Sequence, residues 1–169
     1  MIISLLQKQI PFIDVRAPIE FSKGALPTST NLPILFDDER ELVGKVYKEL
    51  GGRSATELGH SLVKEQIKEE RVEGWITFIE ENPSAYLYCA RGGQRSEIAQ
   101  NWISDSGIDI PRIEGGFKSL RNTCLSILDE AAEDSKEWII VAGKTGSNKT
   151  GIVSKLINGI DLEMHANHR

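Results

Sequence analysis

Cysteine and histidine are scarce in this sequence, with two and three copies among 169 residues. Two cysteines, Cys89 and Cys124, cannot build the disulfide framework of a small secreted domain. No group of histidine, cysteine and carboxylate residues has the spacing of a metal site, so we expect no bound metal. The expected setting is therefore a reducing cytoplasm, in which a reactive thiol persists.

Long apolar runs are also missing. No run approaches the roughly 20 residues that span a bilayer, and the apolar residues 1–6 lack the basic segment and cleavage site of a secretory signal. We therefore expect no membrane contact. The formal net charge of −5 argues against broad, non-specific nucleic-acid binding but allows a local basic face. The remaining composition, 40% hydrophobic and 27% charged, is ordinary for one globular domain.

Residues 86–96 carry the clearest chemical signal. A β-prone run, residues 86–88, leads into Cys89, and a helical apolar pattern follows the pair Gly92-Gly93, which predicts strand, tight loop and helix. The glycines allow successive N–H groups to turn inward, and the helix start adds unpaired donors and the positive end of its dipole. Such a cradle stabilises a cysteine as thiolate, its nucleophilic form.

We assign catalysis to Cys89 in preference to a buried structural role, because a core cysteine needs neither glycines nor arginines beside it. Arg95 can fork onto two oxygens of an oxyanion. The residues assigned to substrate or anion binding in this loop are Arg91, Gly92, Gly93, Gln94, Arg95 and Ser96. Rhodanese-type sulfurtransferases and cysteine-dependent phosphatases both use this architecture. Five residues separate Cys89 from Arg95, as in the phosphatase loop, so spacing alone leaves both chemistries open.

Upstream of the loop, residues 10–16 predict a short buried strand, and residues 31–34 a second one, with one helical turn between them. Three helices are predicted next, at residues 40–50, 54–66 and 71–80. The first would end at the pair Gly51-Gly52. Its apolar residues, Leu42, Val43, Val46, Tyr47 and Leu50, form a stripe with the 3.6-residue period of a helix.

Downstream of the loop, residues 107–113 predict a short strand. Residues 115–116, both glycine, then open a helix in which Lys118 and Arg121 stand about one turn apart. This pattern is compatible with a second anion-binding helix start, and equally with a simple turn beside solvated bases. Cys124 on the same helix is expected in the core.

The last part of the chain combines an apolar run, residues 138–142, with the loop at residues 143–150. The order of strand, loop and a helix at residues 152–157 fits a phosphate-binding P-loop, except that Asn148 stands where glycine is expected. The phosphate contacts would come from Gly143, Gly146, Lys149 and Thr150. Nineteen residues follow Thr150, too few for the remaining strands of a nucleotide-binding sheet, so we expect this domain to be incomplete.

Taken in order, these motifs resemble bacterial tRNA 2-selenouridine synthases, which join an N-terminal rhodanese domain to a C-terminal P-loop domain. The matching stretches are Asp-Val-Arg-Ala-Pro-Ile-Glu-Phe, Val-Tyr-Lys-Glu-Leu-Gly, Leu-Gly-His-Ser-Leu-Val, Tyr-Leu-Tyr-Cys-Ala-Arg-Gly-Gly-Gln-Arg-Ser, Gly-Gly-Phe-Lys-Ser-Leu-Arg and Gly-Lys-Thr-Gly-Ser-Asn-Lys-Thr. The resemblance implies an α/β rhodanese-like domain at residues 1–133, with a mainly parallel sheet flanked by helices. It implies an incomplete P-loop strand–loop–helix segment at residues 137–169. Asp14 and Arg16 would be scaffold residues.

The same resemblance implies a selenium or sulfur transferase. The family replaces the sulfur of wobble 2-thiouridine in certain tRNAs by selenium, through a geranylated thiouridine. Selenophosphate and geranyl diphosphate would be co-substrates, no cofactor is bound, and tRNA and a selenophosphate source would be partners. Cys89 would be the essential cysteine, and residues 143–150 would take the diphosphate.

Two other interpretations stay open. A small phosphatase or arsenate-reductase-like enzyme would use the same Cys-x5-Arg loop, although Tyr88 stands where such phosphatases usually carry histidine and no obvious aspartate general acid follows. A chain that stops inside its second domain is also compatible with an inactive, truncated remnant.

Overall fold

The computed structural model describes residues 2–133, 135 and 137–165. The chain divides into two compact units, Met1–Ala131 and Ala132–Arg169. Within the described residues, no helix combines the length and the apolar character that crossing a bilayer requires.

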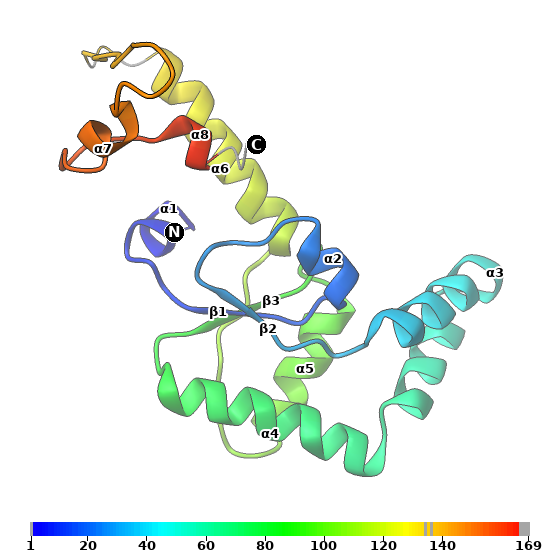
Figure 1. The fold of residues 1–169 in the computed structure, drawn as a ribbon. Helices are drawn as coiled ribbons and strands as arrows, with labels where there is room; N and C mark the ends of the chain where they lie inside the picture. The colour runs from blue at the N-terminus through cyan, green and yellow to red at the C-terminus, as the bar shows by residue number, and fades with distance from the viewer. Residues whose placement is uncertain (1, 134, 136, 166–169) are drawn as a thin grey trace. The chain divides into compact units, whose positions relative to one another are not determined.

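A three-stranded parallel sheet forms the centre of the first unit (Figure 1). Its strands, in the spatial order β2-β1-β3, are β1 (Phe12–Asp14), β2 (Ser29–Asn31) and β3 (Tyr86–Tyr88). β1 pairs in parallel with both neighbours, so Asp14 lies opposite Asn31 and Tyr88. Parallel neighbours need crossover connections, which here contain helices. The predicted α/β class with a mainly parallel sheet is confirmed.

Alternate residues of these strands point to opposite faces of the sheet. Ile13 and Leu87 belong to one buried cluster, whereas Phe12 and Tyr88 belong to another. All four side chains are fully buried. Both faces are therefore covered, as parallel sheets require.

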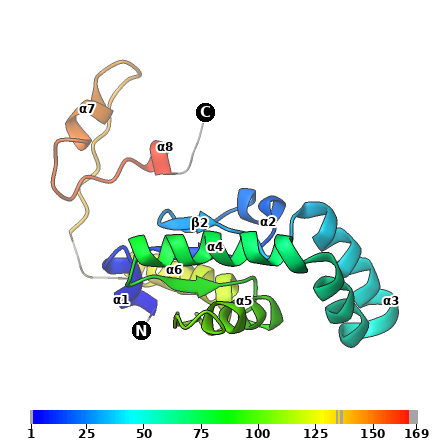
Figure 2. The same ribbon diagram turned by 90° about the horizontal axis from the view of Figure 1, so that it is seen from below.

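One face is covered by helices that connect β2 to β3 or follow β3. These are α3 (Asp37–Leu62), α4 (Glu65–Glu81) and α5 (Gln94–Ser104). Trp75 of α4 and Trp102 of α5 stack with ring centroids 6.2 Å apart. The indole N–H of Trp75 donates to the Leu32 carbonyl oxygen at 2.9 Å, which fixes α4 against the end of β2. Figure 2 shows α4 and α5 beside the sheet, with α3 at one end.

The opposite face is covered by α1 (Ile2–Gln7) and α6 (Gly116–Glu133). Leu5 of α1 and Leu120 of α6 are buried there against Phe12 and Tyr88. The short α2 (Pro18–Ser22) follows β1 and carries proline at its start, where the missing N–H removes no hydrogen bond.

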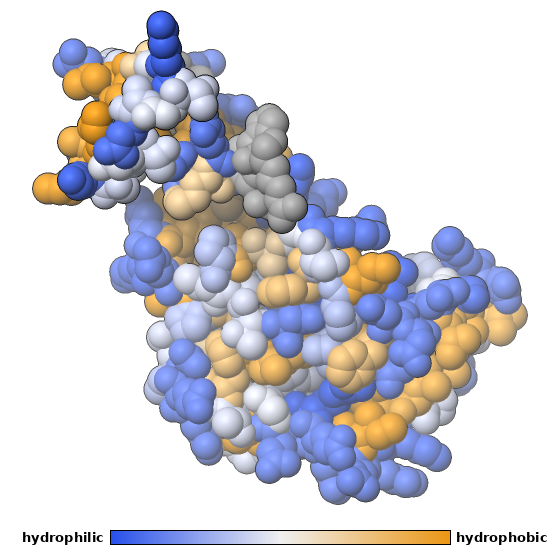
Figure 3. All heavy atoms as spheres, viewed as in Figure 1, coloured by the Kyte–Doolittle hydropathy of each residue, from blue (hydrophilic) through white to orange (hydrophobic). Residues whose placement is uncertain are grey.

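α3 contains two helical parts that meet at a kink. Gly51, at φ 84°, is not helical, so the predicted end of the first helix at the pair Gly51-Gly52 is confirmed, and the second part continues to Leu62. The apolar stripe of the first part is largely at the surface, because Leu42, Tyr47 and Leu50 are 47%, 60% and 68% exposed. Figure 3 shows hydrophobic side chains at the surface over this helix. A 3.6-residue period marks one face of a helix, but it does not supply an element to cover that face.

Two further elements differ in length from their predictions. The helix predicted to reach residue 66 ends at Leu62, and the following Glu65 has the left-handed φ of 49°. Residues 107–113 form one isolated parallel bridge, between Arg112 and Leu87, rather than a strand. The Leu87 N–H and carbonyl oxygen bond to Pro111 and Ile113, so this segment still extends the hydrogen bonding of β3.

In the second unit the predicted strand at residues 138–142 is wrong, because this segment has no regular secondary structure. Its side chains are exposed, with Ile139 at 83% and Ile140 at 87%. Two short helices follow, α7 (Lys149–Val153) and α8 (Leu162–His165), so the helix predicted at residues 152–157 begins earlier. A β-prone run without a neighbouring strand has no ladder to join.

Candidate active site

Cys89 directly follows β3, at the edge where the carboxyl ends of the parallel strands meet. Its side chain is 3% exposed. α5 begins at Gln94 with Gly93 as its N-cap, so residues 89–93 form the turn from strand to helix. In parallel α/β sheets, ligands bind at this carboxyl edge.

The cysteine loop is bonded to the start of α6. The N–H of Phe117 donates to the Cys89 carbonyl oxygen at 2.8 Å, and the N–H of Lys118 donates to the Ala90 oxygen at 3.0 Å. Donors already bonded to carbonyls are not available to an anion. The two amides are thus engaged within the protein, and the predicted anion binding at this helix start would depend on the exposed side chains of Lys118 and Arg121.

Two glycines permit this close approach of backbones. Gly92 has φ 64°, and a β-carbon there would lie 2.7 Å from the Gly115 nitrogen. A β-carbon on Gly116, at φ 56°, would overlap the carbonyl oxygen of Cys89. Gly93 differs, because nothing lies within 4 Å of a β-carbon built there. Glycine is therefore required for steric reasons at Gly92 and Gly116 but not at Gly93.

The Cys89 sulfur lies in a hydrogen-bonding environment that favours a thiolate. Its Sγ is 3.2 Å from Oγ of Ser96, which is fully buried. Burial by itself raises the pKa of this thiol. Hydrogen bonds from the Ser96 hydroxyl and from the amides of Ser96 and Arg91, with the charge of Arg95, nevertheless hold the pKa of Cys89 below its ordinary value. The thiolate is the form that attacks electrophiles.

Arg95 does not present a free fork to an oxyanion. Its Nη1 and Nη2 donate to the two carboxylate oxygens of Glu20 at 2.5 and 3.1 Å. In this structure the guanidinium fork of Arg95 therefore holds a carboxylate of the protein itself, and the binding of an anion by Arg95 stays a prediction. Sequence reasoning missed this role of Glu20. Its place three residues after Ala17 is a helix-capping signal, but its partner lies 75 residues away.

Three further residues of the loop are at the surface. Arg91, Gly93 and Gln94 are exposed. Within the part of the chain that the structure describes, Arg91 takes part in no ion pair. Arg91 is therefore the loop arginine whose charge is available to an arriving anionic substrate.

A buried ion pair underlies the site. The Arg16 guanidinium donates to both carboxylate oxygens of Asp14, with an Nη2–Oδ2 distance of 2.6 Å, and also to the Gly24 carbonyl oxygen at 2.9 Å. Its central carbon lies 3.8 Å from the centroid of the Phe117 ring on α6. The pair thus connects β1 to the helix that supports the cysteine loop, which fits the predicted scaffold role.

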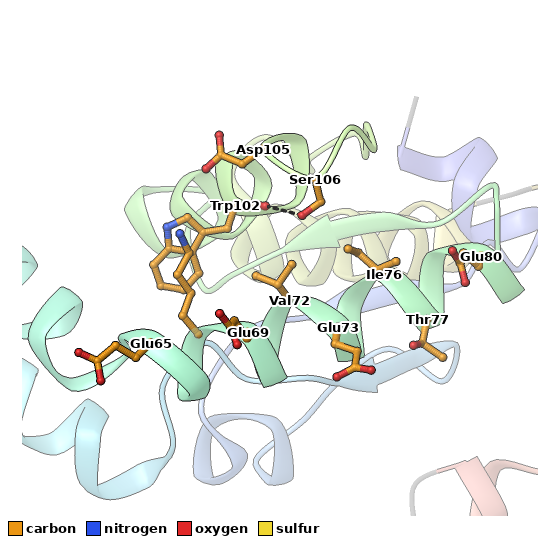
Figure 4. A pocket seen from close by; sticks show the side chains of 11 residues that line it. Glu65, Glu69, Val72, Glu73, Ile76, Thr77, Glu80, Trp102, Asp105 and Ser106 are labelled. Carbon is orange, nitrogen blue, oxygen red and sulfur yellow. Dashed lines mark hydrogen bonds between the residues drawn. The ribbon is translucent and has the colours of Figure 1, made fainter.

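Two hollows adjoin α5. One is an apolar cavity of about 100 Å³ whose lining includes Gln94, Arg95 and Ile98. The other is a groove of about 590 Å³ between α4 and α5, with several acidic side chains along it (Figure 4). No residue of the turn 89–93 lines the groove, so it is separate from the candidate active site.

In the described ranges, no three His, Cys, Asp or Glu side chains group as metal ligands.

The second predicted loop, residues 143–150, is closed by its own lysine. Nζ of Lys149 donates to the carbonyl oxygens of Gly143 and Lys144 at 2.8 and 3.1 Å. Asn148 adopts the left-handed conformation, with φ 59° and ψ 32°. Gly143, Gly146 and Thr150 are exposed.

Comparison with known proteins agrees with this architecture. The model of the rhodanese-like domain matches residues 3–123. The chain belongs to the rhodanese-like domain family. A similar fold occurs in the crystal structure of the N-terminal domain of a Clostridium difficile 630 protein named for ATP/GTP binding. That match has a TM-score of 0.60 and 29% identity, and it covers 69% of this chain and 90% of that domain.

More particularly, the chain is a homologue of tRNA 2-selenouridine synthases. The model of the tRNA 2-selenouridine synthase AAA domain matches residues 136–169. The synthase of Sulfurovum sp. (strain NBC37-1) is 49% identical over 166 residues, which are 98% of this chain and 45% of that protein. The synthase of Shewanella sediminis (strain HAW-EB3) is 52% identical over 159 residues, 94% of this chain and 43% of that protein. This chain therefore spans less than half the length of these relatives.

Proposed function

We propose that this chain transfers selenium or sulfur through Cys89 as part of a tRNA 2-selenouridine synthase. One observation carries the proposal. The Cys89 sulfur lies at the carboxyl edge of a rhodanese-type sheet, within a hydrogen-bonded turn that lowers the pKa of its thiol. The identity to the synthases over 98% of the chain supports the same assignment.

The proposed chemistry is nucleophilic. With thiosulfate as a simple donor, the Cys89 thiolate attacks the outer sulfur, the S–S bond breaks, and sulfite leaves with the electron pair. A persulfide remains on Cys89, and we expect the hydrogen bonds from Ser96 and Arg91 that lower the pKa of Cys89 to stabilise its negative charge as well. Arg91 meets the anionic donor, and the exposed bases Lys118 and Arg121 add positive charge to the same substrate-binding region.

The substrates proposed for the whole reaction follow from the relatives. They are a tRNA with wobble 2-thiouridine, selenophosphate as the selenium donor and geranyl diphosphate for the intermediate geranylated base. A selenophosphate source is the proposed partner. The proposed domains are residues 1–133, which carry Cys89, and residues 137–169, which carry the beginning of the P-loop domain.

The test is an intact-mass measurement after mixing the chain with thiosulfate or with selenophosphate. We expect an added sulfur or selenium on the unaltered chain and on Cys124→Ser, and none on Cys89→Ser. Cys124 is the matched control because it is the other cysteine and is partly buried on α6. An adduct that survives Cys89→Ser would contradict the proposal.

The phosphatase interpretation is tested with p-nitrophenyl phosphate. We expect no turnover that depends on Cys89, because both carboxylate oxygens of Glu20 occupy the fork of Arg95. Turnover by the unaltered chain that is lost in Cys89→Ser would favour a phosphatase. A chain that neither forms an adduct nor hydrolyses the ester would be an inactive remnant.

A further inference from the structure

The apolar cavity of about 100 Å³ lies between α3 and the start of α5. Its walls come from the segment before α3, from α3 and from α5, and they include Leu35, Val43, Gly59, Ile98 and Trp102. Most of the surface that faces the cavity is apolar. A cavity of this kind excludes water and favours an apolar occupant. Transfer of sulfur or selenium at Cys89 by itself gives the cavity no role.

The cavity and the Cys89 sulfur share the first turn of α5. Arg95 lines the cavity, and Oγ of its neighbour Ser96 lies 3.2 Å from Cys89 Sγ. The guanidinium of Arg95 is bonded to Glu20, and its charge contributes to the lowered pKa of Cys89. A group bound at the sulfur and a group bound in the cavity would therefore contact consecutive residues of one helix.

The cavity opens to the surface and has the size of a short branched chain. Tyr47, His60 and Gln94 belong to its lining and are exposed. Since a cavity of about 150 Å³ accepts a six-carbon ring, one of about 100 Å³ accepts roughly four or five carbons. This is the size of one isoprene unit. A geranyl chain consists of two such units, so its terminal unit would fill the cavity and the other would lie along the opening.

We propose that this cavity binds the branched alkenyl chain of an S-alkylated thiouridine whose base lies at Cys89. The inference rests on the proposed function, in which a geranylated base is the intermediate. It assigns recognition of the alkyl group to the rhodanese-like unit rather than to the loop at residues 143–150. Because the chain is uncharged, its binding does not require the ion pair of Arg95 and Glu20 to open. Arg91 stays available to an anionic selenium donor.

The test compares nucleosides by how far each slows alkylation of Cys89 by iodoacetamide, with peptide mass spectrometry as the readout. S-Geranyl-2-thiouridine should protect Cys89 at concentrations at least about tenfold lower than S-methyl-2-thiouridine, because burial of the chain outweighs the cost of ordering it. Burial of about five carbons by itself corresponds to a dissociation constant near 1 mM. Geranyl diphosphate should therefore still bind this chain only weakly.

Gly59→Leu is the variant that fills the cavity. Within 4 Å, a β-carbon built on Gly59 meets only Cγ2 of Val43, at 4.0 Å, so a leucine has room to enter. The advantage of the geranyl compound should disappear. Gly44→Leu is the matched control, because Gly44 lies on the same helix, has open space around its β-carbon and does not line the cavity. Leucine favours the helix over glycine at both positions.

Trp102 provides a second readout. It lines the cavity and stacks on Trp75. The background variant Trp138→Phe removes the exposed tryptophan of the second unit. Geraniol at millimolar concentration should change the tryptophan fluorescence of this background, and Gly59→Leu should abolish the change.

Three results would overturn the proposal. The first is equal protection by the geranyl and methyl compounds in the unaltered chain. The second is an advantage of the geranyl compound that survives in folded Gly59→Leu, and the third is a fluorescence that does not respond to geraniol. If Gly59→Leu does not fold, Val43→Phe fills the cavity from the other part of α3 and decides in its place. Neither readout needs a transferable sulfur or selenium, so a failure here and a failure to form the Cys89 adduct are distinguishable.

Discussion

The two glycine-containing loops of this chain, residues 89–96 and 143–150, have similar local sequences and different surroundings. Each precedes a helix and contains glycines with positive φ, at Gly92 and at Gly146. The first follows a strand inside a paired sheet and is bonded to α6 through two of its carbonyl oxygens. The second follows exposed residues without regular structure.

The two loops differ in the contacts that hold their backbones in place. In the first loop, Ser96 Oγ lies 3.2 Å from the Cys89 sulfur, and β3, α5 and the start of α6 hold the backbone of the loop. In the second, Nζ of Lys149 donates to the carbonyl oxygens of Gly143 and Lys144 in its own loop. We therefore expect these residue types to bind an anion only where tertiary contacts hold the backbone open.

The largest expected effect comes from the ion pair beneath the first loop. Asp14→Ala should lower the free energy of unfolding by about 3–5 kcal/mol, because it leaves the Arg16 charge buried without a partner. Urea unfolding followed by tryptophan fluorescence measures this. The double variant Asp14→Leu/Arg16→Met should recover part of the loss. Lys149→Ala, in the second loop, should leave the same transition unchanged.

The next largest effect on the free energy of unfolding is expected from substituting the glycines of the two loops. Gly92→Ala should cost about 2–5 kcal/mol, because it combines left-handed strain with a β-carbon 2.7 Å from the Gly115 nitrogen. Gly146→Ala meets no atom within 4 Å and should not shift the main unfolding transition. Gly93→Ala, which also meets open space, is the control inside the first loop. Equal effects of Gly92→Ala and Gly93→Ala would contradict this account.

A subtler change follows from Ser96→Ala. After burial, which acts in the opposite direction, the Ser96 side chain is the largest influence on the pKa of Cys89, and it lowers that pKa. Removing it should move the midpoint of the alkylation rate to higher pH and slow alkylation at neutral pH. Ser126→Ala, an exposed change on α6, should leave the profile in place. An unchanged midpoint in Ser96→Ala would rule out this role.

The lowered pKa of Cys89 also makes the free energy of unfolding depend on pH. Because the folded pKa of Cys89 lies below the unfolded one, its contribution to stability is present above the unfolded pKa. The contribution is lost as the pH falls through the folded pKa. Ser96→Ala should flatten this dependence, which unfolding titrations at several pH values would detect.

The smallest expected effect is in the second loop. We expect calorimetry to detect no tight binding of geranyl diphosphate to the unaltered chain, because Lys149 bonds to carbonyl oxygens of its own loop and residues 137–142, which precede the loop, form no strand. Asn148→Gly should change this little, since the preceding segment stays unpaired. Tight binding by the unaltered chain would remove the contrast between the loops.

Local patterns predicted the first unit well where neighbours in sequence are also neighbours in space. The apolar residues Ile13 and Leu87 and the helix carrying Trp75 lie in the core as their periodicity indicates. The same reasoning failed for residues 138–142, where a β-prone run has no partner strand. The period of the stripe on α3 likewise did not tell whether it is buried, and Leu50 is 68% exposed.

The chain's residue types alone determined that Cys89 would end a strand before a glycine turn and a helix, since backbone preferences and hydrophobic periods act over a few residues. They could not determine where Arg95 points. Its two donors are taken by a carboxylate 75 residues away, and such a pairing exists only once α2 and α5 are brought together. Tertiary structure also decided that the start of α6 bonds to the Cys89 carbonyl. Hydrogen-bond donors are assigned by proximity in space, which local sequence does not encode.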